Sequence, residues 1–195
     1  KDLILSFGER LGAIIVAARL RHEGMDAVAM ETDAIGFITN EHHGNAVADL
    51  DLCHKNLGPA LDAAVKKARV PVITGFFGVT TDGHVTTVGR SGTDYSAAVI
   101  AFATNAKLIE IWKEVDGFMS ADPKLVKGAF MLERLSYEEA AELAYFGAQV
   151  LHPRAVQPAR LKGIEIVIKN LYRPESPGSV IGSSRQARQD IIKSV

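Results

Sequence analysis

Short β-branched runs alternate along this chain with segments whose apolar residues recur at helical spacing. The run at 70–77 is typical of a buried strand, whereas segments 93–104 and 153–162 have the periodicity of helices. Parallel strands need long crossover connections, and helices placed in those connections cover the two faces of the sheet. The sequence therefore predicts an α/β fold with a mainly parallel sheet covered on both faces.

Further elements follow from the same pattern and from turn residues. We expect helices at 6–24, 59–67 and 136–146, strands at 27–30, 36–39, 85–88, 108–112, 164–168 and 179–181, and a loop at 42–45. Ser6 with Glu9, and Ser136 with Glu139, have capping-box spacing, which predicts helix starts at both serines. Asp82-Gly83 predicts a hairpin turn.

Composition bounds the class of protein. The chain has 195 residues, 47% of them hydrophobic, and a formal net charge of −1, which suits one globular domain and gives no reason to expect nucleic acid or an anionic membrane as partner. The apolar windows are too short to span a bilayer, and the single Cys53 excludes an internal disulfide. We expect a cytoplasmic location. Because no methionine opens the chain, we expect a fragment.

The sharpest chemical signal lies between an expected strand and an expected helix, at Gly89-Arg90-Ser91-Gly92-Thr93-Asp94-Tyr95. Glycines allow a tight turn and close approach to a ligand, and the helix start favours an anion. Arg90 offers a planar fork for a carboxylate, Thr93 a hydroxyl, and Asp94 a carboxylate that can orient cations. The alternative is that Thr93 or Asp94 only caps the helix and Arg90 is solvated.

A second polar segment follows the expected strand at 108–112. Lys113, Glu114 and Asp116, with Asp122 and Lys124 beyond them, lie where open α/β sheets bind ligands. The carboxylates could hold ribose hydroxyls or magnesium, and the lysines could contact phosphate. The alternative is a polar turn that closes a strand.

Several motifs occur together in a fixed order, and the set resembles the aspartate kinases of the amino-acid kinase superfamily. They are Ser6-Phe7-Gly8-Glu9-Arg10-Leu11, Thr74-Gly75-Phe76-Phe77-Gly78, the 89–95 segment, Trp112-Lys113-Glu114-Val115-Asp116-Gly117, Ala121-Asp122-Pro123-Lys124, Leu135-Ser136-Tyr137-Glu138-Glu139-Ala140, and the 145–153 block that ends in Val150-Leu151-His152-Pro153. The resemblance runs from Ser6 to about Ile181. It implies a three-layer αβα sandwich of the carbamate kinase-like type, forming one catalytic domain over 1–182, with 183–195 as a linker towards a regulatory ACT domain.

The resemblance also implies roles for individual residues. Aspartate would be bound by Ser6, Glu9, Phe76, Arg90 and Thr93, with Glu9 on its α-ammonium and Arg90 on a carboxylate. Asp94, together with Arg90, would serve catalysis by organising the cationic groups around the phosphoryl. The nucleotide-facing positions would be Lys113, Glu114, Met119, Asp122, Lys124 and Gln149. No protein-held metal is implied.

The implied reaction is the ATP-dependent phosphorylation of the aspartate side-chain carboxylate, the first step towards lysine, threonine and methionine, with Mg²⁺ as cofactor and a homodimer as the usual assembly. A carboxylate is already ionised at neutral pH, so no strong general base is required. Catalysis then depends on alignment and on neutralising phosphoryl charge.

The chain departs from the family pattern in four ways. We expect that it starts after the glycine-rich loop whose lysine holds phosphates, and that it stops before the ACT domain. Lys113-Glu114 replaces the usual Thr-Asp, and Gln149 replaces a lysine. We therefore expect the 195-residue piece alone to be inactive. The alternatives are a sister kinase of the superfamily, acting on glutamate, acetylglutamate or a nucleotide, and a non-catalytic regulatory subunit. The kinase interpretation needs the 90–94 and 114–122 segments to face one cavity.

Overall fold

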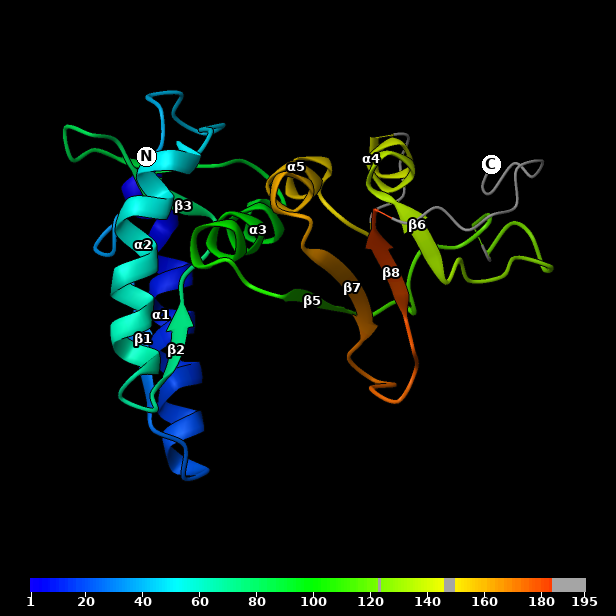
Figure 1. Cartoon of the computed structure of the whole chain (residues 1–195), viewed down its shortest axis with the longest axis horizontal. Coiled ribbons are helices and arrows are strands. Elements are labelled where there is room, and N and C mark those ends of the chain that lie inside the picture. Colours follow the sequence, from blue (N-terminus) through cyan, green and yellow to red (C-terminus); the bar gives the residue numbers. More distant parts are fainter. Residues whose placement is uncertain (123, 146–149, 184–195) are drawn as a thin grey trace. The chain divides into compact units, whose positions relative to one another are not determined.

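The computed structural model describes residues 1–122, 124–145 and 150–183 (Figure 1). The chain divides into two compact units, one spanning Lys1–Asn105 and one beginning at Ala106. A single catalytic domain over 1–182 stays a prediction, and the predicted linker at 183–195 lies almost entirely outside the described residues.

The first unit combines three helices with two small sheets. Its elements are α1 (Asp2–His22), β1 (Ala27–Met30), α2 (Leu50–Val65), β2 (Val70–Ile73), β3 (Phe77–Val79), β4 (Val85–Thr87) and α3 (Gly92–Thr104). β1 and β2 pair in parallel, and β3 and β4 form an antiparallel hairpin around the predicted Asp82-Gly83 turn, where Gly83 has a φ of +91°. α1 packs on β1 and β2, while α2 packs on β2 and on α3 (Figure 1).

The core of this unit lies around α2 and α3. It contains Phe37, Cys53, Leu57, Leu61, Val88, Tyr95 and Val99. By contrast, α1 buries only Asp2, Ser6, Ala13 and Ala17, so the apolar stripe read from the sequence is mostly exposed: Leu11, Ile14 and Ile15 are each more than half exposed. Small alanines four residues apart let the helix approach the sheet closely, which turns the larger side chains outward.

In its described residues, the second unit is a four-stranded sheet with two helices. Its elements are β5 (Leu108–Lys113), β6 (Arg134–Ser136), α4 (Tyr137–Tyr145), α5 (Pro153–Lys162), β7 (Glu165–Asn170) and β8 (Ser179–Gly182). The strand order is β5-β7-β8-β6, with β5–β7 and β6–β8 parallel and β7–β8 antiparallel. α4 and α5 contact each other; α4 also packs on β6 and β8, and α5 on β7 (Figure 1). Ile109, Ile111, Leu135, Ile166, Ile168 and Ile181 form the buried face of the sheet.

Two predicted helix starts in this unit are confirmed. At α4, the Ser136 N–H donates to Glu139 Oε2 at 2.8 Å and the Glu139 N–H donates to Ser136 Oγ at 3.2 Å, which is the reciprocal capping box. At α5, His152 is extended, as expected before Pro153, and its Nδ1 accepts from the Arg154 N–H at 3.1 Å. His152 therefore has a structural role as a helix cap.

Other predictions about elements were wrong. Ser6 does not begin a helix, because α1 already starts at Asp2 and Ser6 Oγ donates back to the Leu3 carbonyl at 2.8 Å. Segment 36–39 makes only isolated bridges, one from Ile38 and one from Thr39. α2 starts at Leu50 rather than at Pro59, since Asp49 caps it by accepting from the Leu52 N–H at 2.9 Å.

Candidate functional site

A pocket of about 730 Å³ in the first unit gathers residues from four segments that are far apart in the sequence. The start of α1, the loop at 43–44, the β3–β4 hairpin and the 87–90 turn all contribute to it. Lys1 and Arg90 carry positive charge, and the imidazoles of His43 and His84 line the pocket beside them. Asp2 is the single acidic residue among those that line it. The pocket therefore suits an anionic ligand better than a cationic one.

Phe76, one of the predicted substrate residues, lines this pocket in a backbone conformation that is rare for a residue with a side chain. Its φ is +69°, in the left-handed region. Both of its backbone groups are bonded: its N–H donates to Ser96 Oγ at 2.9 Å, and its carbonyl accepts from the Val88 N–H at 2.9 Å. These bonds hold the strained residue in place. The predicted 70–77 strand is shorter in the structure, since β2 ends at Ile73 and Phe77 begins β3.

The predicted 89–95 turn has the geometry that its glycines suggested. Gly89 has a φ of +92°, and α3 begins at Gly92. A Cβ on Gly92 would lie 2.4 Å from Val88 Cγ2 and 3.4 Å from the Phe76 ring, so only glycine fits there without displacement. The exposed Arg90 between them lines the pocket. The turn therefore brings Arg90 and Phe76 to one site.

Thr93 and Asp94 lie in the first turn of α3, as predicted. Thr93 packs on Gly75, where an added Cβ would come within 2.9 Å of Thr93 Cγ2. This contact places Thr93 directly beside the segment that carries Phe76. Asp94 is half-buried.

The two predicted α1 residues stand apart from the pocket wall. The Ser6 hydroxyl is buried, donates to the Leu3 carbonyl and accepts from Arg10 Nε at 3.1 Å. Glu9 is half-buried one turn further along. Arg10 reaches away from α1 to the carboxylates of Glu31 and Asp33. Sequence reasoning assigned no role to Arg10, although it lies in the same motif.

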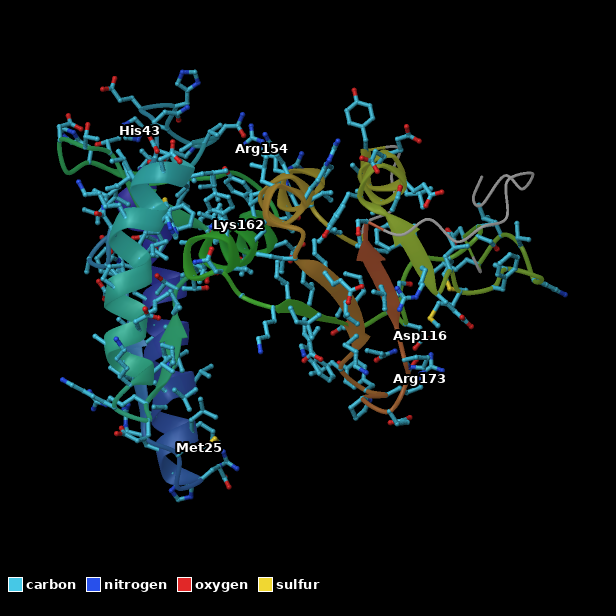
Figure 2. The ribbon with its side chains drawn as sticks, viewed as in Figure 1. Met25, His43, Asp116, Arg154, Lys162 and Arg173 are labelled. Atoms are coloured by element: carbon cyan, nitrogen blue, oxygen red, sulfur yellow. The ribbon has the colours of Figure 1, made fainter. Side chains whose placement is uncertain are left out.

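Asp2 and His43 were also missed by sequence reasoning. The 42–45 segment was expected to be a solvated loop, and a lone aspartate ahead of an apolar helix carries no signal of its own. In the structure, Asp2 is only 5% exposed and its carboxylate bonds to that loop. Figure 2 labels His43, whose Nδ1 lies 3.3 Å from Asp2 Oδ2.

The predicted nucleotide residues lie in the second unit. Lys113 is the last residue of β5, and its carbonyl accepts from the Leu171 N–H at 2.8 Å. Glu114 follows it, with its carboxylate accepting from the Tyr172 hydroxyl at 3.2 Å, a bond that raises the pKa of Tyr172. Met119 forms an isolated bridge with Met131.

The remaining nucleotide positions are more exposed. Asp122 Oδ1 accepts from the Lys124 N–H at 2.9 Å, and both side chains are exposed. Gln149 lies outside the described residues, so its predicted role stays a prediction.

Polar contacts fix the turn that follows Glu114. Asp116 accepts from Asn170 Nδ2 at 2.7 Å and pairs with Arg173 (Figure 2). Gly117 has a φ of +151°, and a Cβ there would meet Ser179 Oγ at 2.2 Å. Contacts with β7 and β8 therefore hold the turn that follows β5.

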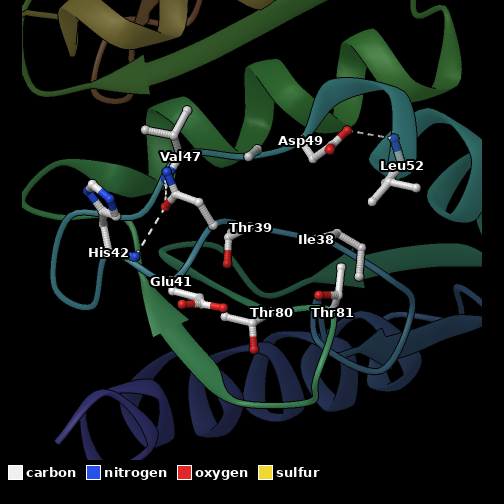
Figure 3. Close-up of a pocket in the computed structure, with 11 residues that line it drawn as sticks. Ile38, Thr39, Glu41, His42, Val47, Asp49, Leu52, Thr80 and Thr81 are labelled. Carbon is white, nitrogen blue, oxygen red and sulfur yellow. Dashed lines mark hydrogen bonds between the residues drawn. The ribbon is translucent and has the colours of Figure 1, made fainter.

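A second pocket of about 560 Å³ in the first unit is drawn in Figure 3. Its polar wall includes Glu41, His42 and Asp49, and Asn40 Oδ1 accepts from the His42 and Val47 N–H groups at 3.3 and 3.0 Å. None of the predicted site residues lines it. Across the described part of the chain, no three His, Cys, Asp or Glu side chains are grouped as a metal site would require, and no helix has the length and apolarity needed to cross a bilayer.

Comparison with known proteins shows which protein family this chain belongs to. The sequence model of the "Amino acid kinase family" matches residues 1–170, and the chain belongs to that family. Among individual relatives, it is 40% identical to aspartokinase 1, chloroplastic, of Arabidopsis thaliana, over all of this chain and 34% of the relative, and 37% identical to the aspartokinase of Schizosaccharomyces pombe, over 93% of this chain and 34% of the relative. The chain thus spans about a third of the length of these relatives.

Solved structures agree with this assignment. Escherichia coli aspartokinase III in complex with aspartate and ADP aligns with a TM-score of 0.89 at 30% identity, covering 95% of this chain and 41% of that one. UMP kinase from Ureaplasma parvum aligns with a TM-score of 0.65 at 16% identity, over 93% of this chain and 71% of that one, which is a likeness of fold alone. The predicted amino-acid kinase fold, of the α/β class with mostly parallel strand pairing, is confirmed.

Proposed function

We propose that the protein to which this chain belongs is an aspartate kinase, transferring the γ-phosphoryl group of ATP to the side-chain carboxylate of aspartate. The observation that carries the proposal is the pocket that joins Arg90 and Phe76 in a cationic setting, in a chain most of whose length is similar to aspartokinases. Magnesium would accompany the nucleotide, since phosphoryl transfer requires neutralisation of the phosphate oxygens.

Within this proposal the pocket takes the amino acid. Arg90 would form a bidentate pair with one carboxylate of aspartate, and Phe76 would bound the side of the site. Thr93, packed on Gly75, would donate its hydroxyl to the substrate. Glu9 would bind the α-ammonium group, and Ser6 would belong to the same substrate-binding set.

Asp94, at the start of α3, would orient cationic groups around the phosphoryl rather than accept a proton, because the attacking carboxylate is already ionised. Lys113, Glu114, Met119, Asp122, Lys124 and Gln149 would face the nucleotide. A place at the entry to lysine, threonine and methionine synthesis, a homodimeric assembly and a cytoplasmic location belong to the same proposal.

The test is an assay of the complete gene product with ATP, Mg²⁺ and aspartate, in which hydroxylamine traps the acyl phosphate as a hydroxamate. We expect hydroxamate with aspartate and at least about a hundredfold less with glutamate or acetylglutamate, since a misplaced carboxylate loses a charged hydrogen bond. A preference for another acceptor would favour the sister-kinase alternative.

A non-catalytic role is the second candidate, and the observation that favours it is Gln149 at a position where the family pattern has lysine. Calorimetry on the complete product with Mg-ATP and aspartate separates the two. Binding of both ligands without hydroxamate formation would support the regulatory subunit and overturn the kinase.

A further inference from the structure

Asp2 occupies an unusual position in the cationic pocket. It is the single carboxylate among the lining residues, and it is only 5% exposed. Its Oδ2 accepts from the Gly44 N–H at 2.9 Å and from the Thr87 N–H at 2.9 Å, and His43 Nδ1 lies 3.3 Å away. One oxygen atom thus joins the start of α1 to the 43–44 loop and to the end of β4.

These contacts continue towards Arg90. Thr87 also bonds directly to the residues just after the 43–44 loop, since the Ala46 N–H donates to the Thr87 carbonyl at 3.0 Å. Gly89 packs on Asn45, where an added Cβ would lie 3.2 Å from Asn45 Oδ1. Asp2 therefore braces, through the loop and β4, the turn that carries Arg90, which lines the pocket.

The hydrogen-bond donors around Asp2 favour the ionised form of its carboxyl group. Burial alone would raise its pKa, but the Thr87 and Gly44 amides and His43 outweigh that effect and hold the pKa below its ordinary value. Around it, His84 is paired with Asp82 at 2.8 Å, while Lys1 and Arg90 line the pocket. An ionised Asp2 that is satisfied by amides stabilises the walls and still leaves the pocket open to an anionic ligand.

We propose that Asp2 is a positioning residue for the amino-acid substrate, holding the 43–44 loop and the 87–90 turn so that Arg90 meets the substrate carboxylate. This inference rests on the proposed function for its substrate, although the bracing itself does not depend on it. The alternative roles are direct contact with the substrate ammonium and simple anchoring of the α1 start, where an acidic residue also interacts favourably with the helix dipole.

The test combines kinetics with amide hydrogen exchange on the complete gene product. Asp2→Asn turns the carboxylate into a neutral carboxamide, in which an NH2 group replaces one oxygen, and Asp2→Glu restores the charge. Asp26→Asn is the matched control, because Asp26 is an exposed carboxylate whose partner, Arg69, is also at the surface. We expect Asp2→Asn to raise the KM for aspartate about tenfold, leave the KM for ATP within about twofold and speed exchange at Gly44 and Thr87. Asp2→Glu should recover part of each effect.

Any result other than a raised KM for aspartate together with faster exchange at Gly44 and Thr87 overturns the proposal. A raised aspartate KM with unchanged exchange at Gly44 and Thr87 would mean direct substrate contact. Faster exchange with an unchanged aspartate KM, or KM values for both substrates rising together, would mean anchoring of α1 alone. If the wild-type protein forms no aspartyl phosphate, the proposed function fails. Unchanged exchange in Asp2→Asn would separately overturn the bracing.

Discussion

The guanidinium of Arg10 lies over the ring of Phe77, 4.6 Å from its centroid. The same guanidinium binds Glu31 and Asp33, and the Arg10 side chain is only 13% exposed. Arg10 thus joins α1 to the segment after β1 and to β3, the strand that follows Phe76. A cation that is largely removed from water, paired with carboxylates and stacked on a ring contributes more to stability than a surface pair.

We therefore predict that Arg10→Met lowers the free energy of unfolding by about 2–3 kcal/mol, since it leaves Asp33 without its charged partner. Urea unfolding followed by circular dichroism measures this. Arg19→Met on the same helix is the control: its pair with Glu23 is exposed, and its loss should cost less than about 1 kcal/mol. Equal effects of the two substitutions would contradict the account.

At the start of α3, Gly92→Ala is expected to destabilise the protein by about 1–3 kcal/mol, because the new methyl would overlap the stiff side chain of Val88. Gly8→Ala is the matched control, since a Cβ there meets nothing within 4 Å and α1 gains helix propensity. Thermal unfolding of both variants gives the comparison. An unfolding temperature for Gly92→Ala at or above wild type would show that the turn is looser than described.

The lowered pKa of Asp2 predicts a pH-dependent contribution to stability. A carboxyl whose pKa is depressed by folding contributes fully above its ordinary value of 3.8, and the contribution is lost as the pH falls through the lower folded value. The difference in unfolding free energy between wild type and Asp2→Asn should therefore shrink on going from about pH 6 to about pH 2. Urea titrations across that range measure it, and a constant difference would refute the charged role of Asp2.

Burial raises the pKa of the Cys53 thiol to about 12. The native thiol should therefore stay protonated and resist iodoacetamide at about pH 8, whereas the unfolded chain should be alkylated within minutes. The sign for stability is the reverse of that for Asp2: the protonated thiol favours the folded state, and this contribution falls as the pH rises from about 9 towards 12. Mass spectrometry of the labelled protein measures the extent of alkylation. Rapid labelling of the native protein would contradict the prediction, because it would show that the Cys53 thiol is accessible and ionised.

The parts of the fold that could be predicted are those set by local chemistry. Strand 27–30 and helix 153–162 have the predicted bounds, and the capping box at Ser136 has the predicted bonds. The predictions were wrong where a contact between residues far apart in the sequence determines where an element begins. Ser6 looked like a cap but lies inside α1, which starts at Asp2, and Asp2 is anchored by the amide of Thr87, 85 residues away.

The candidate site divides in the same way. The 89–95 turn was predictable, because glycine and a helix start are local signals. Asp2, His43 and Arg10 were not, since each acts through tertiary contacts that no spacing encodes. The left-handed backbone of Phe76 likewise depends on tertiary contacts, with Ser96 and Val88.

The most direct test of the central claim is the steady-state kinetics of Arg90→Gln in the complete gene product. Removing the guanidinium should raise the KM for aspartate by about tenfold to a hundredfold while the KM for ATP stays within about twofold, because a charged hydrogen bond is lost on the amino-acid side only. An aspartate KM equal to that of wild type would contradict the assignment of this pocket to the substrate.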